Sequence, residues 1–554
     1  MNLESLPNEI ILILFEYFSL FELFQYFRGL NSLFNNLLFQ EFNKFQLDLR
    51  SLSKTKFDQI CQQYAPSILN QIVSIHLSND YDTPQEIQLL LSQDYQLRQF
   101  IHLESLSIIN LQSKQILGEI MNECSHLPHL THLTIQCTIE MSENDTQHLF
   151  NQVWSLPKLK SIHLNMNSTR NSSNSTIISK SLKYLNIEHN IYSLSRFADL
   201  YRNTPNLRHL SAWFVVEYNE FQILKPIDSI TRLNITFYGL ENMLEHVLEN
   251  LPNLYQLKCD LNVYINGYQW ESIIKKSLPK LKIFQVKMRF TPPSNNQNID
   301  EKLNKIIDSY RTNFWINEHQ WYIRCHWYTL DEKIDLFNFI DVFTVPYSSD
   351  RFYEDNICLL AKSTVQYDKE YLQCPCITTL NYGSSSFTDP IRSRFRFNNI
   401  EHLSLSLPFN ENFFFIVSKF VRLRSLFVYT DTNKNVNNIQ FQLQLVLDQA
   451  PRLYSLEFTT WSRSDSESPF EGLRSVSVRR LDLIRFNFND QVYHFDEKEC
   501  IELSRSFLDH YWPENGSVSS AMDGLVQWLR QQLPPTCAVT KDENDSFGIH
   551  LWIR

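Results

Sequence analysis

The sequence predicts an α/β fold in which a short N-terminal helical segment precedes a curved solenoid of parallel strands. A pattern of the form L-x-x-L-x-L, with aliphatic substitutions, recurs roughly every 23 to 29 residues from about residue 70 onward. The segments between copies carry apolar residues at helical spacing, so each repeat contributes one strand and one helix. The first forty or so residues lack this repeat and instead carry apolar residues at helical spacing throughout.

The N-terminal segment predicts three short helices that are apolar on almost all sides. We expect the first helix to bury a stripe spaced at i, i+3, i+4, i+7 and i+8, made of Ile10, Ile13, Leu14, Tyr17 and Phe18. Its other side carries Ile11, Leu12 and Phe15. The apolar residues of the second and third helices are Leu20, Phe21, Leu23, Phe24 and Phe27, then Leu30, Leu33, Phe34, Leu37 and Leu38. Three such helices cannot bury all of this surface among themselves, which predicts a protein partner.

The start of this segment resembles an F-box. Leu6-Pro7-x-Glu9-Ile10, followed by hydrophobic residues at the spacing described above, is similar to that family over residues 1–45. The resemblance implies a helical module that binds a Skp-type adaptor and, through it, a cullin in a ubiquitin ligase. We expect the adaptor to contact Leu6, Pro7, Ile11, Leu12, Phe15, Leu20, Leu23 and Phe24. The alternative is that these helices only cap the solenoid behind them.

Residues 46–290 contain eight clear copies of the strand pattern and one earlier copy. The copies are Leu103/Leu106/Ile108, Leu130/Leu133/Ile135, Leu159/Ile162/Leu164, Leu182/Leu185/Ile187, Leu207/Leu210/Ala212, Ile230/Leu233/Ile235, Leu254/Leu257/Cys259 and Leu281/Phe284/Val286, with an earlier one at Ile72/Ile75/Leu77. Their spacing is typical of leucine-rich repeats. The chain resembles the irregular leucine-rich repeats of F-box proteins, which implies a horseshoe with parallel strands on its concave face.

The polar residues that alternate with the core leucines predict a binding surface. In a strand they point away from the core, so on a horseshoe they line the concave face. We expect this face to bind a target protein, with Tyr184 and Trp213 as aromatic anchors. The remaining candidate target-binding residues are His132, Gln136, His163, Asn186, His209, Arg232 and Asn234.

Residues 291–395 break the repeat spacing. We expect a helix over 299–312 and a half-buried strand in which Trp321, Ile323, Cys325 and Trp327 alternate. These residues are interpreted as degenerate helix-plus-strand units that continue the solenoid, and the alternative is an inserted domain. Repeats resume over 396–554, and the copies there are Ile400/Leu403/Leu405, Leu423/Leu426/Val428, Leu453/Leu456/Phe458 and Val478/Leu481/Leu483.

The last residues predict a C-terminal cap for the open end of the repeat core. We expect an amphipathic helix over 522–533, then two strands over Cys537–Thr540 and Phe547–Ile553. The segment 168–176 is expected to be a surface loop because it is built of Ser, Thr, Asn and Arg.

Composition makes several function classes improbable. The formal net charge is −11, which disfavours nucleic-acid binding as the main activity. No apolar run approaches the roughly 18 residues of a membrane span, and no signal peptide pattern is present, so we expect a soluble chain in the cytoplasm or nucleus. Ten cysteines without framework spacing are expected to be free thiols.

Motifs for catalysis or cofactor binding are not found. The nine glycines are too far apart for G-x-G-x-x-G, a Walker loop or a nucleophile elbow, and no histidine begins an H-E-x-x-H pattern. Cys124, His126, His129 and His132 have zinc-like spacing, but they coincide with the start of a repeat strand, so no metal is expected. Cys374-Pro375-Cys376 is expected to be a free-thiol loop.

These observations favour a non-catalytic receptor without a cofactor. In this hypothesis residues 1–45 bind a Skp-type adaptor and the concave face binds a target protein. The alternative hypothesis is a protein-interaction scaffold outside ubiquitin ligases.

Overall fold

The computed structural model describes most of the chain between residues 3 and 553. The described residues are 3–42, 44–50, 52, 54–79, 86–92, 95–168, 177–192, 194–215, 226–292, 298–329, 339–345, 351–354, 357–365, 377–383, 396–409, 413–417, 419–430, 436–459, 478, 480–484, 537–541 and 549–553. The chain divides into two units, Met1–Phe284 and Gln285–Arg554, which are described separately below.

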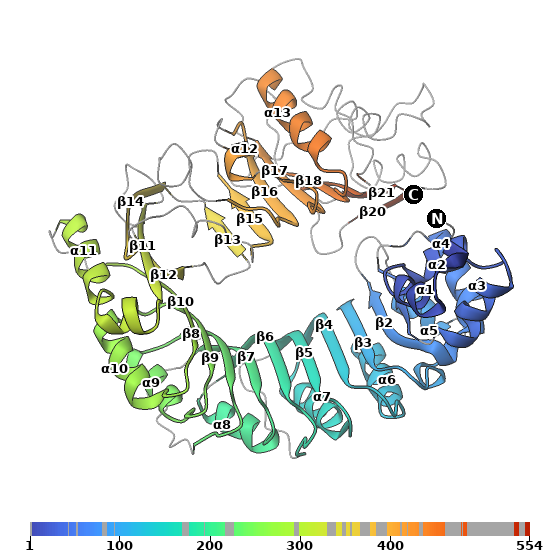
Figure 1. The fold of residues 1–554 in the computed structure, drawn as a ribbon, viewed down its shortest axis with the longest axis horizontal. Coiled ribbons are helices and arrows are strands. Elements are labelled where there is room, and N and C mark those ends of the chain that lie inside the picture. The colour runs from blue at the N-terminus through green and yellow to red at the C-terminus, as the bar shows by residue number, and fades with distance from the viewer. Residues whose placement is uncertain are drawn as a thin grey trace. The chain divides into compact units, whose positions relative to one another are not determined.

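Unit 1 is built on a parallel sheet whose strands follow one another in sequence order (Figure 1). The strands are β1 (Phe45–Asp48), β2 (Ile72–Ser78), β3 (Ser105–Leu111), β4 (His132–Met141), β5 (Ser161–Ser168), β6 (Tyr184–Tyr192), β7 (His209–Val215), β8 (Arg232–Tyr238) and β9 (Gln256–Leu261). Each strand pairs in parallel with the next. The repeat copies predicted from Ile72 to Cys259 therefore do form consecutive parallel strands. The structure adds β1, which the repeat pattern does not predict.

Helices connect these strands and cover one face of the sheet (Figure 1). They are α4 (Lys54–Gln59), α5 (Glu86–Ser92), α6 (Lys114–Cys124), α7 (Glu143–Ser155), α8 (Leu194–Asn203), α9 (Glu241–Glu249) and α10 (Gly267–Ser277). The apolar residues of the repeat point into the layer between sheet and helices, and Leu133, Ile135 and Leu210 are at most 1% exposed. This mixed α/β arrangement with a large parallel sheet is compatible with a leucine-rich-repeat-like solenoid.

The N-terminal segment contains three helices, as predicted, but the first one buries the opposite side from the one expected. The helices are α1 (Asn8–Phe15), α2 (Leu20–Tyr26) and α3 (Ser32–Asn36), which a π turn over Leu37–Glu41 extends. Ile11 and Phe15 are buried at 1% and 0% exposure, whereas Ile13 is 51% and Tyr17 is 83% exposed. Tyr17 lies beyond the end of α1, and Pro7 immediately precedes its first residue.

The first part of unit 2 corrects the expectation of parallel repeats. Helix α11 (Ile299–Ser309) lies inside the predicted range 299–312. The strands β10 (Ile283–Phe290), β11 (Tyr322–Thr329), β12 (Phe339–Val345) and β14 (Ile357–Ser363) pair as β10–β12, β12–β11 and β11–β14, all antiparallel. Arg324 and His326 of β11 are buried together with Ile323 and Cys325 on the opposite face, so both faces of the strand are covered and it is not half-buried.

The second part of unit 2 returns to parallel pairing. Its strands are β13 (Arg351–Glu354), β15 (Thr379–Tyr382), β16 (His402–Leu407), β17 (Ser425–Thr430), β18 (Ser455–Thr459) and β19 (Arg480–Ile484). They pair in that order in parallel, and α12 (Phe413–Ile416) and α13 (Val436–Gln449) accompany them. The four repeat copies predicted between Ile400 and Leu483 therefore do form strands.

The predicted C-terminal strand pair is present as β20 (Cys537–Lys541) and β21 (Ile549–Ile553). These strands are antiparallel to each other, and β21 is antiparallel to β19. The predicted helix over 522–533, the loop over 169–176 and the Cys374–Cys376 pair lie outside the described residues. Among the described helices, none is long and apolar enough to cross a membrane.

Candidate protein-interaction surfaces

The buried side of the N-terminal segment is an aromatic cluster that joins these helices to the first strand. Phe15 packs edge-on against Phe42, with ring centroids 5.7 Å apart, and Phe42 packs against Phe45 of β1 at 4.8 Å. Phe24 stacks on Tyr64 at 4.8 Å. The guanidinium of Arg28 lies over both of these rings, 5.7 and 5.5 Å from their centroids. This side of the helices therefore caps the start of the unit 1 sheet.

Local signals explain where these helices begin. Ser19 and Glu22 form a capping box at the start of α2, in which Glu22 N–H donates to Ser19 Oγ and Ser19 N–H donates to Glu22 Oε2. The Ser19 backbone N–H, and next the Ser19 hydroxyl, which also donates to Glu22 Oε2 at 2.8 Å, lower the pKa of Glu22 below its ordinary value. Asn31 caps α3 by accepting from Phe34 N–H at 3.0 Å. These caps fix where α2 and α3 begin, whereas α1 has no side-chain cap and follows Pro7 directly.

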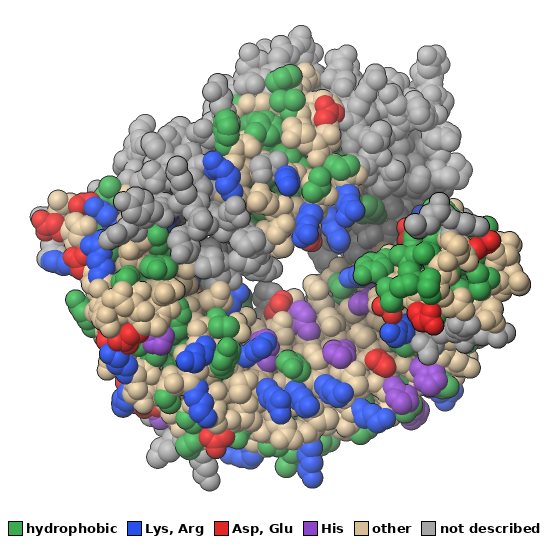
Figure 2. Space-filling view, in the orientation of Figure 1, with side chains coloured by type: hydrophobic (Ala, Val, Ile, Leu, Met, Phe, Trp, Pro, Cys, Tyr) green, Lys and Arg blue, Asp and Glu red, His purple; other side chains and the backbone are tan. Residues whose placement is uncertain are grey.

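The outer side of the same segment carries seven large apolar side chains in contact with solvent. We call this set the N-terminal apolar patch, and its members are Leu3, Ile10, Ile13, Tyr17, Phe18, Tyr26 and Leu30, which are 38% to 83% exposed. A hydrogen bond of 2.6 Å from Asn31 Nδ2 to Glu4 Oε1 joins the chain next to Leu3 to the chain next to Leu30, the first and last members of the patch in sequence. Figure 2 shows the patch as hydrophobic side chains gathered over α1 and α2.

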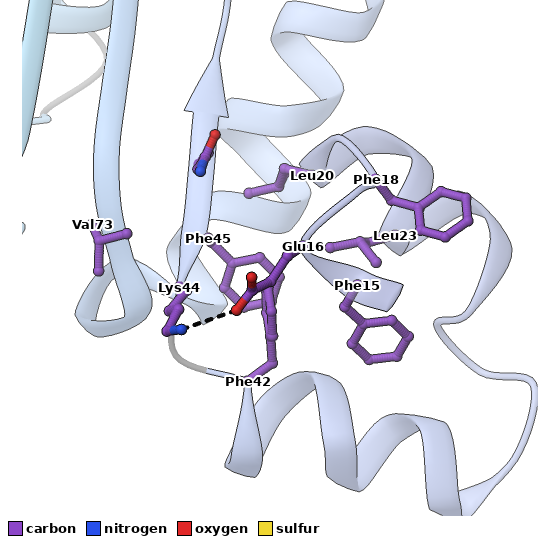
Figure 3. A pocket seen from close by; sticks show the side chains of 10 residues that line it. Phe15, Glu16, Phe18, Leu20, Leu23, Phe42, Lys44, Phe45 and Val73 are labelled. Atoms are coloured by element: carbon purple, nitrogen blue, oxygen red, sulfur yellow. Dashed lines mark hydrogen bonds and ion pairs between the residues drawn. The ribbon is translucent and has the colours of Figure 1, made fainter. Parts of the chain in front are cut away.

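A pocket of about 190 Å³ lies beside this patch (Figure 3). Its apolar walls come from the first two helices, from the chain leading into β1, and from β2; the lining residues are Phe15, Phe18, Leu20, Leu23, Phe42, Phe45 and Val73, with Glu16, Lys44 and Gln46. Lys44 Nζ lies 2.9 Å from Glu16 Oε1, so an ion pair closes part of the wall. Because Phe18 belongs to both features, the pocket and the N-terminal apolar patch are continuous.

These positions change the candidate contact residues of the N-terminal segment. Five of the eight predicted adaptor contacts are buried in the cluster and pocket walls, with exposures of 3% or less: Ile11, Phe15, Leu20, Leu23 and Phe24. Phe15, Leu20 and Leu23 line the pocket, so a partner side chain would meet them there, and the role of all five residues as adaptor contacts stays a prediction. Pro7 is exposed, and Leu6 and Leu12 are half-buried. The accessible contact residues are those of the N-terminal apolar patch.

The strand face of unit 1 brings the nine predicted target-binding residues onto one surface. The register aligns a first row of His132, Ser161, Tyr184, His209, Arg232 and Gln256, and a second row of Thr134, His163, Asn186, Ser211, Asn234 and Lys258. Gln136, Asn165 and Glu188 begin a third row on β4 to β6. A register shift after Ile187 then brings Trp213 opposite Ile191. All of these residues lie on the face opposite the buried leucines.

Contacts within this face are polar and local. Glu188 accepts from Asn165 Nδ2 at 3.1 Å and lies 3.2 Å from His163 Nε2. Asn234 Nδ2 donates to Ser211 Oγ at 3.1 Å. Tyr184 and Trp213 remain 45% and 38% exposed. The face therefore offers hydrogen-bonding groups on a rigid sheet together with two accessible aromatic rings, which suits recognition of a protein surface.

The zinc-like cysteine and histidines of the third repeat do not form a cluster. Cys124 is fully buried on α6, and burial raises the pKa of its thiol to about 12, which disfavours the thiolate that a metal needs. His126, His129 and His132 are exposed. In the part of the chain that the structure describes, no group of three or more His, Cys, Asp or Glu is placed to hold a metal ion.

Comparisons with known proteins do not assign this chain to a family. No protein-family model matches it, and no curated protein matches it. Among solved structures, the crystal structure of a TLR13–ssRNA13 complex aligns with 79% of this chain at 12% sequence identity and a TM-score of 0.22. The alignment covers 59% of that chain. A TM-score this low supports no conclusion about fold or function.

Proposed function

We propose that this protein is a non-catalytic receptor that links two other proteins. In this proposal the N-terminal apolar patch binds a Skp-type adaptor of a cullin-based ubiquitin ligase, and the strand face of unit 1 binds the protein to be modified. The observation that carries the proposal is the exposed apolar surface on the outer side of the N-terminal helices, whose inner side packs against the start of the unit 1 sheet. Seven large apolar side chains are exposed within residues 3–30, and Tyr17 alone is 83% exposed.

The physical argument is the cost of leaving such a surface in water. Isolated exposed apolar residues are common, but a contiguous group marks an interaction site. Burying one large apolar side chain contributes about 1.5–3 kcal/mol, so a partner that covers several of them gains a strong driving force. The adjoining pocket gives that partner a place for one apolar side chain.

The identity of the proposed partner, a Skp-type adaptor, comes from the F-box resemblance. The Leu6-Pro7-x-Glu9-Ile10 start and the three helices that follow are what this resemblance rests on. The adaptor assignment therefore rests on sequence similarity, whereas the exposed patch supports binding of some apolar partner. The experiment below separates these two claims.

The test uses the full-length chain and a purified Skp-type adaptor. Ile13→Glu combined with Tyr17→Glu places two charges at patch positions that are 51% and 83% exposed. We expect at least about a hundredfold loss of adaptor affinity, since two buried contacts and two uncompensated charges are involved. The matched control is Phe415→Glu with Phe441→Glu, two apolar residues of unit 2 that are 65% and 63% exposed.

The control variant should bind the adaptor as the wild type does, and both variants should unfold at the wild-type temperature. Equal affinity of the patch variant and the wild type would place the adaptor elsewhere. A wild-type chain that does not bind the adaptor would contradict the ligase part of the proposal.

A second candidate function is an interaction scaffold whose N-terminal helices cap the sheet. It is favoured by the aromatic cluster, in which Phe24 and Phe42 pack against Phe45 of β1 and Phe15 packs against Phe42. Capping and adaptor binding use opposite sides of the same helices. Binding of a target by the strand face, together with failure of the wild-type chain to bind any Skp-type adaptor, would favour the scaffold.

A further inference from the structure

The start of the unit 1 strands carries three positive charges at equivalent positions on neighbouring strands, and a fourth, Arg232, lies one residue further along, opposite His209. Lys160 and Lys183 stand immediately before β5 and β6, Arg208 stands immediately before β7, and Arg232 is the first residue of β8. Their backbones are hydrogen-bonded in succession: Lys183 N–H donates to Lys160 O at 2.8 Å, Arg208 N–H to Lys183 O at 2.9 Å, and Arg232 N–H to Arg208 O at 3.0 Å. We call these four residues the basic strip.

The charges of the basic strip are not neutralised within the described part of the chain. Among the described residues, no carboxylate lies within 4.0 Å of any of the four side-chain cations. The first row of the strand face contains no acidic residue from β4 to β9. The row that contains Lys160, Lys183 and Arg208 does include an acid, Glu104, which lies two strands from Lys160 beyond Thr131. Further along β6, Glu188 is engaged by His163 and Asn165. Figure 2 shows Lys and Arg side chains gathered along the visible face of unit 1.

This arrangement is unfavourable without an anion. Neighbouring strands are about 4.8 Å apart, and like charges directly opposite each other in a sheet repel. Lys160, Arg208 and Arg232 are exposed, and Lys183 is half-buried. A chain with a net charge of −11 nevertheless keeps three cations level with one another and a fourth one residue further along at the start of these strands. An anionic ligand would relieve their repulsion.

We propose that the basic strip binds an acidic polypeptide segment of the target protein. This inference rests on the proposed function, because it names the chemistry that the strand face recognises. Three strand spacings span about 14 Å, which matches an extended stretch of four or five residues. Carboxylates of that stretch would lie over the strip, while amide and hydroxyl groups of the second row, such as Asn186, Ser211 and Asn234, would meet its backbone.

An acidic polypeptide fits this surface better than a nucleic acid does. Proteins that follow a phosphate backbone usually neutralise about six to ten phosphates, whereas the basic strip offers four cations. The overall negative charge of the chain repels a long polyanion, but a short acidic segment interacts mainly with the cations it touches. Tyr184, which stands beside the strip in the first row, adds an apolar contact for a neighbouring side chain of the segment.

The test measures binding of a fluorescently labelled oligoglutamate peptide of about eight residues to the full-length chain. We expect affinity that falls as sodium chloride is raised, and at least a tenfold loss in the double variant Lys183→Glu/Arg208→Glu. The matched control is Lys305→Glu/Lys419→Glu, which makes the same change in net charge at two exposed lysines of unit 2. It should change the affinity by less than twofold. A milder variant, Lys183→Gln/Arg208→Gln, guards against misfolding and should also weaken binding.

Three results would overturn the inference. These are no peptide binding by the wild type, the same loss in the control as in the strip variant, and tighter binding of labelled oligouridylate RNA that the strip variant abolishes. Adaptor binding is measured on the same proteins. Failure of the adaptor to bind while the peptide still binds at the strip would contradict the proposed ligase role and leave this inference standing.

Discussion

The N-terminal helices and the strand face of unit 1 differ in how clearly their sequence separates inside from outside. In β4 apolar and polar residues alternate, so Ile135 is buried at 0% exposure while Thr134 faces outward. In α1 nearly every residue is apolar, and both sides of the helix satisfy the same hydrophobic pattern. Alternation assigns a face of a strand, whereas uniform apolarity leaves the choice of face to tertiary packing.

The sharpest test of the strand side of this comparison is a charge placed at two adjacent residues of β4. Ile135→Asp buries a carboxylate without a partner, and we expect it to lower the free energy of unfolding of unit 1 by more than about 3 kcal/mol. Thr134→Asp puts the same group on the outer face, where the expected change is within about 0.5 kcal/mol. Urea unfolding followed by circular dichroism measures both, and similar losses in the two variants would mean that the two faces are not distinct.

An equivalent pair tests the first helix. Phe15→Ala removes a ring from the aromatic cluster, and we expect it to destabilise unit 1 by about 3–5 kcal/mol. Tyr17→Ala removes a ring of similar size that is 83% exposed, with an expected change within about 0.5 kcal/mol. Thermal unfolding of the two variants against the wild type decides between the faces. A larger loss of stability for Tyr17→Ala than for Phe15→Ala would mean that the side of the helix predicted from apolar spacing is the buried one.

Residues of α1 nevertheless contain a weak signal for the correct face. Glu9 and Glu16 lie four positions before and three positions after Ile13, so the helix presents them on the same side. Both glutamates are exposed, and so is Ile13 between them. Apolar spacing alone therefore predicts the wrong buried side of α1, whereas the two glutamates mark the exposed side. A segment that is apolar on both sides is better divided by its few charged residues.

The repeat strands could be predicted almost completely, since Leu or Ile recurs at fixed positions and each strand extends the one before it. The antiparallel strands of unit 2 could not be predicted. Arg324 and His326 are polar, which indicates an outward-facing side, yet both are buried. Arg324 Nε donates to His326 Nε2 at 2.8 Å, and His326 Nδ1 lies 2.9 Å from the hydroxyl of Tyr328. Such a buried polar set depends on long-range pairing that no local pattern records.

Strand β1 was missed for a similar reason. Phe45 and Leu47 alternate over only four residues, and the first position of the repeat pattern before Leu47 and Leu49 is Lys44, a charged residue. The candidate strand face, by contrast, follows directly from alternation, and its nine residues lie in the expected rows. Which apolar residues of the N-terminal segment are buried could not be predicted locally, because burial there depends on contacts with Phe42, Phe45 and Tyr64, which lie beyond the third helix or at its end.

The smallest expected effect concerns the electrostatics of the strand face. Burial, and next the positive charge of Arg232, hold the pKa of His209 below its ordinary value of 6.5. We expect Arg232→Gln to raise the pKa of His209 without restoring the ordinary value, because burial is the larger cause and persists. Titration of the His209 ring protons by nuclear magnetic resonance measures the shift. Lys305→Gln, a charge removal in unit 2, is the control and should leave the titration unchanged.

The sign of this shift also fixes its effect on stability. Since the folded chain favours the neutral imidazole of His209, unfolding takes up a proton at acidic pH. The contribution of His209 to stability is complete above the unfolded pKa of about 6.5 and declines as the pH falls from there toward the folded pKa. Arg232→Gln should narrow that pH window, because it brings the two pKa values closer together. An unchanged or lower pKa in Arg232→Gln would show that the charge of Arg232 does not act on the first row, and it would weaken the case for an unneutralised basic strip.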